Sequence, residues 1–364
     1  MKLIVSGGGT GGHIYPALTL IDAIKSKRPD AEFLYVGTQK GLEADIVPKA
    51  GINFTALNLE GGLERRFTLE NFSRAANAIW SIKHASDIVK NFKPNVVVGT
   101  GGYVCGPILL AASLMKVPTL IQEQNAVAGV TNKILSKFVT KIAVGTHDAL
   151  KNFPAEKTVY TGNPIRSEVL AAKKSDGLKE FGFTEDKPIV LISGGSRGAR
   201  SINNAMIEVL KSAAQKNSAQ FLHVTGKGEF DAVTEKLTDV LDAPNIKVVP
   251  YLYNMPRAMA MADLAIFRAG ATGLAELTAR GVPSILIPYP FAAENHQEFN
   301  ARALVEAGAA RMILNKDLTA EILSAKIDEL LTAPETLKKM SEASLSLGKP
   351  HAADEIAELI LELR

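Results

Sequence analysis

Short apolar, β-branched runs alternate with amphipathic stretches along the whole chain of 364 residues. This alternation is typical of a parallel sheet whose crossover connections are helices, and it therefore favours the α/β class. Strands are predicted at 2–6, 33–36, 54–57, 96–99, 119–122 and 141–144, and again at 189–193, 221–224, 246–249, 264–267, 284–287 and 311–314. Helices are expected between them, for example at 14–27, 202–216 and 273–280.

The pattern breaks near residues 160–166 and then starts again with the same order of strand, glycine cluster and helix. We therefore expect an α/β fold of two Rossmann-like, doubly wound domains, at residues 1–162 and 163–349. Ligands bind beyond the carboxyl ends of the strands in such sheets, so two domains facing each other would leave a ligand cleft. A terminal helix at 350–364, amphipathic over 352–363, is expected to pack back onto the first domain.

Composition narrows the class of protein without revealing its chemistry. With 46% hydrophobic and 22% charged residues, the chain is expected to be soluble and globular. Its apolar runs are too short for a membrane span, and its first residues do not resemble a signal peptide. One cysteine fits a reducing cytosol, a net charge of +3 is too small to argue for nucleic acid, and the six histidines lack metal-ligand spacing.

Three glycine-rich loops directly follow predicted strands, at residues 7–13, 99–107 and 194–200. Glycine permits a sharp turn and lets backbone N–H groups approach an anion at a helix N-terminus. A tight turn between strand and helix explains any one of them equally well. Three in one chain favour a ligand-binding edge.

The first glycine loop also matches a dinucleotide pattern, because Gly7, Gly9 and Gly12 satisfy G-x-G-x-x-G. A dinucleotide-binding protein should end its second strand with an acidic residue that holds a ribose. That strand is followed here by Gly37 and Thr38, so the dinucleotide interpretation is disfavoured. None of the three loops has the P-loop pattern of ATP-hydrolysing proteins.

Several charged and polar side chains stand where they would complete a site. Arg166, at the predicted domain junction, is suited either to a diphosphate or to an interdomain salt bridge. Glu276, one turn inside a predicted helix, either compensates the helix dipole or accepts ribose hydroxyls. The amide-rich stretches 122–125 and 294–297 either contact sugar hydroxyls or cap helices. His13 closes the first glycine loop and is either structural or a proton-transfer group.

Residues 7–13, 101–107, 123–125, 163–166, 194–200, 268–276 and 295–297 together resemble the MurG family from end to end. That family transfers N-acetylglucosamine (GlcNAc) from UDP-GlcNAc to lipid I, the undecaprenyl-pyrophosphoryl N-acetylmuramyl (MurNAc) pentapeptide. The product is lipid II, used for peptidoglycan. The resemblance implies the two-domain GT-B fold and an inverting transfer to the C4 hydroxyl of MurNAc, with no metal ion or other cofactor.

The resemblance also implies the roles of single residues. The second domain would hold the donor, with Arg166 and Ser196 on the diphosphate, the backbone of Leu252 on uracil and Glu276 on the ribose. The catalytic base is a separate hypothesis from the chemistry: the acceptor hydroxyl is a poor nucleophile, and His13, with Glu123 as the alternative, is predicted to take its proton. The remaining donor contacts would come from Gln297 on the sugar, from the turn of Ala271, Thr272, Gly273, Leu274 and Ala275, and from Thr10, Gly11, Gly12 and Asn125 of the first, acceptor-binding domain.

Two positions depart from the family pattern. Gly273 stands where a residue with a hydroxyl is common, so one hydrogen bond to the donor is expected to be missing. Arg197 stands where glutamine is frequent, which would add positive charge near the diphosphate. Neither departure contradicts the resemblance.

An acceptor anchored in lipid requires a surface that meets the membrane. The helical pattern at 72–90 carries Phe72, Ile79 and Trp80 beside Lys83, and the stretches 114–116 and 137–138 are similar. Apolar residues rimmed by lysine and arginine suit an anionic inner-leaflet surface, which predicts a peripheral protein on the cytoplasmic face of the cell membrane. Most of these apolar residues could equally well pack against the sheet and cover it. Trp80 is the one expected to be exposed.

Two other functions are weighed against the transferase. A sugar-nucleotide epimerase would bind the same donor without an acceptor, but it would need carboxylates for elimination chemistry and no membrane surface. A sugar-nucleotide-binding or membrane scaffold protein would need neither a base nor a diphosphate-binding arginine.

Overall fold

The computed structural model describes residues 1–57 and 70–363, with the backbone alone for residues 70–79. The chain divides into two compact units. Unit 1 consists of Met1–Ile165 and His351–Arg364, and unit 2 consists of Arg166–Pro350. The division falls after Ile165, three residues beyond the predicted boundary at 162, because the side chain of Asn163 bonds to Gln122 and to the backbone of Gln124 in unit 1.

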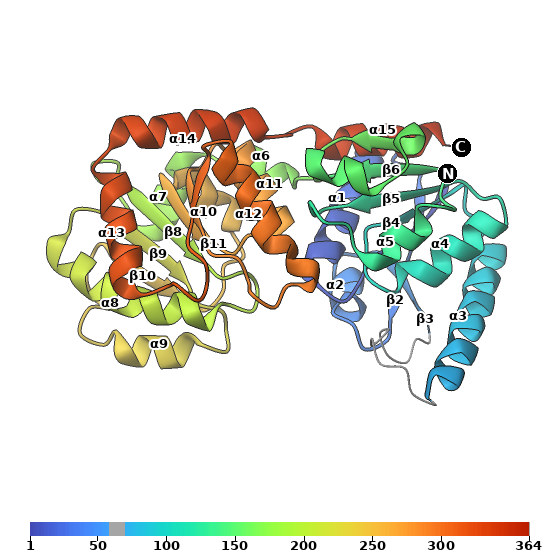
Figure 1. Cartoon of the computed structure of the whole chain (residues 1–364), viewed down its shortest axis with the longest axis horizontal. Helices are drawn as coiled ribbons and strands as arrows, with labels where there is room; N and C mark the ends of the chain where they lie inside the picture. The colour runs from blue at the N-terminus through green and yellow to red at the C-terminus, as the bar shows by residue number, and fades with distance from the viewer. Residues whose placement is uncertain (58–69, 364) are drawn as a thin grey trace. The chain divides into compact units, whose positions relative to one another are not determined.

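Unit 1 is built on a parallel sheet which, among the described residues, has seven strands (Figure 1). The strand order is β3-β2-β1-β4-β5-β6-β7, so the direction of winding reverses between β1 and β4, as in a Rossmann sheet. The strands are β1 (Lys2–Ser6), β2 (Glu32–Thr38), β3 (Asn53–Leu57), β4 (Val96–Gly99), β5 (Thr119–Glu123), β6 (Lys141–Val144) and β7 (Thr158–Tyr160).

The helices of unit 1 cover both faces of this sheet, and the last of them comes from the end of the chain. That helix, α15 (Ala352–Glu362), packs on α1 (Gly11–Lys27) through Ile356 and Ile360, and Lys27 pairs with Glu358 at 2.8 Å. The other helices are α2 (Glu43–Lys49), α3 (Glu70–Phe92), α4 (Cys105–Leu114), α5 (Val130–Leu135) and the 3₁₀ turns η1 (His147–Asn152) and η2 (Ala155–Lys157).

Unit 2 repeats the same winding with its own sheet, in the order β10-β9-β8-β11-β12-β13. Its strands are β8 (Ile189–Ser193), β9 (Gln220–Val224), β10 (Ile246–Val249), β11 (Leu264–Phe267), β12 (Ser284–Leu286) and β13 (Ala310–Met312). Its helices are α6 (Ser167–Ala171), α7 (Lys174–Phe181), α8 (Arg200–Lys216), α9 (Phe230–Lys236), α10 (Met255–Met261), α11 (Ala271–Ala279), α12 (His296–Glu306), α13 (Ala320–Leu331) and α14 (Pro334–Leu347), with the 3₁₀ turn η3 (Ala293–Asn295).

The central strands explain why the sequence pattern was informative. Every residue of β4 and β8 is buried, because helices cover both faces of each sheet. Strands buried on both faces read as continuous runs of valine and isoleucine. The predicted class, an α/β fold with two Rossmann-like doubly wound domains, is confirmed. The cleft between them stays a prediction.

One strand was not predicted, and the bounds of several other strands differ from the prediction by one or two residues. Strand β7 was missed, because its three residues are only half-buried at the edge of the sheet and give no long apolar run. The last strand, predicted at 311–314, is Ala310–Met312. No helix in residues 1–57 and 70–363 is long and apolar enough to cross a bilayer.

Candidate functional site

The predicted glycine loops lie at the reversal point of each sheet. In unit 1 they follow β1 and β4, and in unit 2 the 194–200 loop follows β8, next to the turn after β11. Ligands of doubly wound sheets bind at this carboxyl edge, where neighbouring strands diverge to helices on opposite faces. The predicted glycine loops therefore lie at the edge where ligands are expected to bind.

His13 lies in the first turn of α1, with its imidazole held between the two glycine loops of unit 1. Its Nδ1 lies 2.9 Å from the carbonyl oxygen of Gly8. Because a carbonyl only accepts, Nδ1 carries the proton, and in the neutral ring Nε2 has a free lone pair. A side chain on Gly101 would lie 2.7 Å from Cδ2 of the ring, so glycine is required there for the histidine to fit.

Neighbouring side chains brace these two loops. The hydroxyl of Thr100 donates to the carbonyl of His13 at 2.7 Å, and the hydroxyl of Tyr35 donates to the carbonyl of Gly7 at 2.6 Å. The thiol of Cys105 bonds to the carbonyl of Gly101. Burial raises the pKa of Cys105 to about 11 and raises the pKa of Tyr35 well above its ordinary value, so both groups stay neutral at physiological pH.

Glu43, which sequence reasoning missed, also belongs to the first loop. This fully buried carboxylate accepts from the backbone N–H of Gly9 at 3.2 Å, and from the N–H and hydroxyl of Thr38 at 2.9 and 2.7 Å. The chain thus supplies its own anion to the N–H of Gly9. In a dinucleotide-binding loop such amides meet a pyrophosphate, so the structure gives a second reason against that interpretation.

The start of α1 presents the other predicted residues of the first loop. Thr10 occupies the N-cap position, but its side chain makes no capping hydrogen bond, and the first turn has no acidic residue. Thr10 and Gly12 are exposed, and Gly11 is half-buried. The first amides of this helix are therefore available to an anionic or hydroxylated ligand.

Glu123, the alternative base, is a buried structural carboxylate at the end of β5. Its Oε1 accepts from the backbone N–H of Asn125, and its Oε2 accepts from the N–H of Gly129 and the amide of Asn132, all at 2.9–3.0 Å. Both oxygens are thus engaged in shaping the loop that follows. Asn125 is half-buried, and its own amide also contacts Glu123, so its orientation depends on this carboxylate.

In unit 2, the 194–200 loop is folded tightly against β9. Gly195 and Gly198 both have a positive φ, and a side chain on Gly198 would lie 2.0 Å from the carbonyl oxygen of Thr225. Ser196 is consequently exposed at the tip of the loop. The first turn of α8, which follows, contains no acidic residue, so its N-terminal dipole is open to an anion.

The turn after β11 leads into a second helix whose N-terminus, like that of α8, has no acidic residue in its first turn. Helix α11 begins after Gly270 with neither a side-chain cap nor an acidic residue in its first turn. Its early residues are Ala271, Thr272, Gly273, Leu274 and Ala275. Among the described residues, the buried hydroxyl of Thr272 has no hydrogen-bond partner. A buried polar group of this kind is expected to gain a partner when a ligand binds.

Arg166 and Glu276, predicted to contact different parts of the donor, lie together. Nε of Arg166 donates to Oε1 of Glu276 at 2.8 Å, and both residues belong to unit 2. The Glu276 carboxylate is 6% exposed, whereas the Arg166 guanidinium is 33% exposed. This ion pair lies within unit 2, and the predicted alternative, an interdomain salt bridge of Arg166, stays a prediction.

A second cation, Arg268, stands at the same edge and received no role from sequence reasoning. Its guanidinium donates to the carbonyls of Ile287 and Pro288 and to the side chains of Asn315 and Ser201, at 2.9–3.0 Å. All four acceptors are neutral, and burial lowers the pKa of Arg268 to about 10. The residue ties the turn after β12 to the start of α8 and adds positive charge there.

Gln297 and Leu252 are the remaining two residues predicted to contact the sugar nucleotide in unit 2. Oε1 of Gln297 accepts from the backbone N–H of Tyr289 at 2.9 Å, which orients its carboxamide. The side chain of Leu252 packs on the core of unit 2. Within the described part of the chain, neither the amide nor the carbonyl of Leu252 has a backbone partner.

The predicted membrane residues can be judged only in part. Trp80 is 70% exposed, as expected, and the ammonium of Lys83 lies 5.6 Å from the centre of its ring. The side chains of Phe72 and Ile79 lie outside the described residues. Further apolar side chains of unit 1 are exposed on or near α4 and α5: Leu114, Val130, Ile134 and Phe138.

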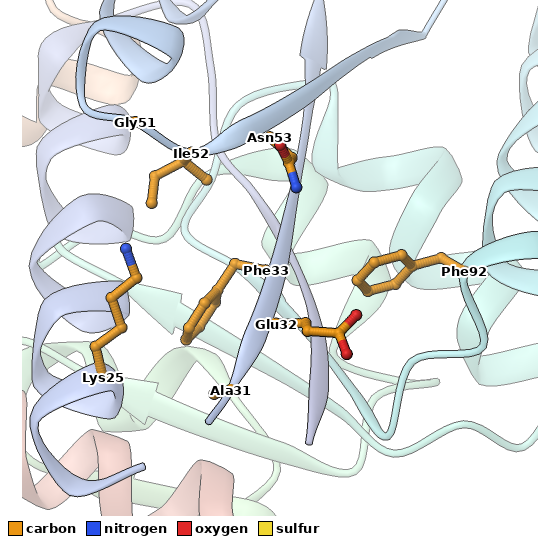
Figure 2. A pocket seen from close by; sticks show the side chains of 8 residues that line it. All are labelled: Lys25, Ala31, Glu32, Phe33, Gly51, Ile52, Asn53 and Phe92. Carbon is orange, nitrogen blue, oxygen red and sulfur yellow. The ribbon is translucent and has the colours of Figure 1, made fainter. Parts of the chain in front are cut away.

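Unit 1 has a hollow that none of the predicted site residues lines (Figure 2). It is at the amino ends of β2 and β3, and Lys25, Glu32, Phe33, Asn53 and Phe92 are among its lining residues. None of the predicted site residues lines it, and it lies at the edge opposite to the glycine loops. In the described ranges, no group of three His, Cys, Asp or Glu side chains is arranged to hold a metal ion.

Comparison with protein families gives the class of protein. Residues 3–144 match the glycosyltransferase family 28 N-terminal domain, and residues 189–357 match the glycosyltransferase family 28 C-terminal domain. The two matches cover most of the chain in the expected order. The protein is therefore a glycosyltransferase with two Rossmann-like domains.

Curated relatives define the family more narrowly. The chain is 47% identical over 363 residues to UDP-N-acetylglucosamine–N-acetylmuramyl-(pentapeptide) pyrophosphoryl-undecaprenol N-acetylglucosamine transferase 1 of Bacillus cereus, covering 100% of this chain and 99% of the relative. The crystal structure of Acinetobacter baumannii MurG matches with a TM-score of 0.79 and 28% identity, over 99% of both chains. The chain belongs to the MurG family.

The fold alone does not separate this family from the epimerases. The crystal structure of UDP-GlcNAc 2-epimerase from Neisseria meningitidis matches over 100% of both chains with a TM-score of 0.68. Its sequence identity is only 16%, so this match shows a shared fold and nothing more. The distinction between transferase and epimerase rests on the family and on the site residues.

Proposed function

We propose that this chain transfers GlcNAc from UDP-GlcNAc to the C4 hydroxyl of MurNAc in lipid I, which gives lipid II. The family supports the substrates, since the Bacillus cereus relative bears both in its name. The observation that carries the proposal is the arrangement at the carboxyl edge of unit 2. There, two helix N-termini without acidic residues lie at the reversal point of the sheet, and the Arg166–Glu276 pair extends from the second of them.

Unit 2 binds the donor in this proposal. Ser196 and the amides at the start of α8 and α11 surround the diphosphate, with Thr272 as a hydroxyl donor and Arg166 as the cation. The amide and carbonyl of Leu252, which have no backbone partner among the described residues, match the acceptor and donor groups of uracil. Oε2 of Glu276 accepts ribose hydroxyls, and the Nε2 end of the oriented Gln297 amide contacts the sugar. These donors neutralise the departing UDP, so that no metal ion is needed.

Unit 1 binds the acceptor and supplies the base. His13 takes the proton of the C4 hydroxyl on Nε2 while the oxygen attacks the anomeric carbon and UDP leaves from the opposite face. The Nδ1 bond to Gly8 supports this role, because it fixes the tautomer in which Nε2 has its lone pair. Glu123 is the weaker candidate, since both of its oxygens already accept hydrogen bonds. Thr10, Gly11, Gly12 and Asn125 complete the contacts to the sugar nucleotide.

The site of action follows from the acceptor. We propose that unit 1 meets the anionic inner leaflet as a peripheral protein on the cytoplasmic face of the cell membrane. Exposed Trp80 would enter the interface together with the exposed side chains of Leu114, Val130, Ile134 and Phe138 in the same unit, and Lys83 would meet the headgroups. Phe72 and Ile79 are proposed on the sequence pattern alone.

The test is UDP release from UDP-GlcNAc with and without a short-chain lipid I analogue. The transferase predicts release that depends on the acceptor, continues in EDTA and yields a β-linked disaccharide. Equal consumption of the donor without acceptor would favour an epimerase or a hydrolase. Acceptor-dependent release abolished by EDTA and restored by a divalent cation would refute only the metal-independent mechanism.

A further inference from the structure

The peptide unit between Gly8 and Gly9 lies between two ionisable side chains. Its carbonyl, on Gly8, accepts from Nδ1 of His13 at 2.9 Å, and its N–H, on Gly9, donates to Oε2 of Glu43 at 3.2 Å. In a trans peptide the C=O and N–H groups point in opposite directions and share one conjugated plane. The carboxylate and the imidazole are thus connected through a single amide.

We propose that Glu43 is a positioning residue for the transfer reaction, which through this peptide unit holds His13 in the Nδ1–H tautomer and in its orientation. The inference rests on the proposed function, in which Nε2 of His13 receives the acceptor proton. The peptide stands where a carboxylate–histidine pair would have a direct hydrogen bond. Glu43 itself contacts no substrate.

Two hydrogen bonds from Thr38 hold the Glu43 carboxylate in the orientation that this role requires. Oε1 accepts from both the N–H and the hydroxyl of Thr38 at the end of β2, which leaves Oε2 directed at Gly9. An anion that accepts from an N–H polarises the amide, and the carbonyl at its other end becomes a stronger acceptor. Complete burial of Glu43 strengthens this effect, because little water screens its charge.

The glycines around the carboxylate indicate that the loop is built to contain it. A Cβ atom on Gly8 would lie 2.6 Å from Oε1 of Glu43, and one on Gly37 would lie 2.5 Å from its Cγ. On Gly41 a Cβ atom would lie 2.2 Å from Oε1. At the other end of the connection, Gly101 leaves the space for the imidazole ring. The carboxylate, the peptide and the ring therefore fit together only with glycine at these positions.

The test is Glu43→Gln in the full chain, with Asp45→Asn as the matched control. Asp45 lies on the same helix and its side chain is 70% exposed, so the control removes one charge without touching the loop. Selective ¹⁵N labelling of the six histidines reports the tautomer, and His13→Gln identifies the His13 signals. Turnover with the lipid I analogue and thermal unfolding are measured on the same samples.

We expect Glu43→Gln to change the ¹⁵N signals of His13 from the Nδ1–H form to a mixture of tautomers. It should also lower kcat by about tenfold with little change in the KM for UDP-GlcNAc, since base catalysis is worth ~10²–10⁴-fold in total. Asp45→Asn should change neither. Loss of thermal stability with wild-type tautomer and kcat would overturn the proposal, because it would show a purely structural carboxylate.

If Glu43→Gln does not fold, Glu43→Asp decides. It keeps the buried charge on a shorter side chain that no longer reaches Gly9, so the same change of tautomer is expected, and an unchanged tautomer overturns the proposal. The turnover of His13→Gln separates failure of the proposed function from failure of this inference. If His13→Gln retained wild-type turnover, His13 would not be the base, while the ¹⁵N signals would still report whether Glu43 sets its tautomer.

Discussion

Arg166 and Glu276 are separated by 110 residues in the chain and meet in an ion pair of 2.8 Å at the carboxyl edge of unit 2. Only one nitrogen of the guanidinium makes this bond, and the carboxylate is the more deeply buried partner. Glu276 thus anchors Arg166 against α11. We infer that the pair acts as one element, in which the carboxylate faces the ribose and the guanidinium faces the diphosphate.

Replacement of Arg166 by alanine is expected to lower kcat by about 10²-fold or more. The departing diphosphate gains charge in the transition state, and a well-placed donor to such a group is worth ~2.7–4 kcal/mol. The measurement is steady-state UDP release with saturating acceptor. Arg257→Ala is the control, because Arg257 forms a surface pair with Glu180 in the same unit. Activity of Arg166→Ala within about twofold of wild type would exclude the proposed role.

Glu276→Gln is expected to weaken discrimination between a ribose and a deoxyribose. In the carboxylate, Oε1 accepts from Arg166 and Oε2 is left to accept from the ribose hydroxyls, whereas the amide of glutamine has only one acceptor oxygen for both partners. Wild type should bind UDP several-fold better than 2′-deoxy-UDP, and the variant should bind both similarly. Competition against UDP-GlcNAc measures the two inhibition constants. A variant that keeps the full preference for UDP would show that Glu276 serves only to hold Arg166.

The sequence predicted those parts of the fold and site that follow from local pattern. The short runs of valine, isoleucine and leucine at Val96–Gly99 and Ile189–Ser193 indicated central strands, because a parallel strand covered on both faces shows no alternation of apolar and polar residues. The glycine clusters after these strands had to be turns. Within each sheet, the edge at which such a turn lies follows as well, since all parallel strands of a sheet end on the same side.

What the sequence missed depends on contacts between distant residues. Glu43 looks like any acidic residue at the start of a short helix, and nothing in the sequence shows that Thr38 and Gly9 surround it. Glu123 was the predicted alternative to His13 as the base, and its place in a polar stretch after a strand agreed with either role. Only the folded loop brings Gly129 and Asn132 onto its second oxygen.

The stability of unit 2 is expected to fall in mild acid because of His223. This buried side chain bonds through Nε2 to Asn203 at 3.0 Å, while its Nδ1 has no partner among the described residues. Burial lowers the pKa of His223 to about 4, from an ordinary value of 6.5. Between these values the unfolded chain binds a proton that the folded chain does not, so stability is complete above pH 6.5 and declines as the pH falls towards 4.

The loss from this residue is at most roughly 3 kcal/mol, since one pKa unit corresponds to about 1.36 kcal/mol. Urea unfolding followed by circular dichroism between pH 7 and pH 5 measures it. His223→Gln should flatten the dependence on pH, because glutamine can still donate to Asn203 but does not titrate. His351→Gln, at an exposed histidine, should leave it unchanged. Equal slopes for wild type and His223→Gln would mean that other groups cause the acid sensitivity.

Trp80→Glu is expected to reduce sedimentation with anionic vesicles by several-fold. The exposed indole gains by entering the interface, whereas a carboxylate there is repelled by anionic headgroups and costly to bury. Ile322→Glu is the control, because Ile322 is an exposed apolar residue on α13 of unit 2, away from the residues assigned to the donor. Turnover of a water-soluble acceptor analogue should be the same in both variants, so that a change in vesicle binding is separated from damage to the site. If Trp80→Glu sediments with the vesicles as wild type does, the membrane surface lies elsewhere on the protein.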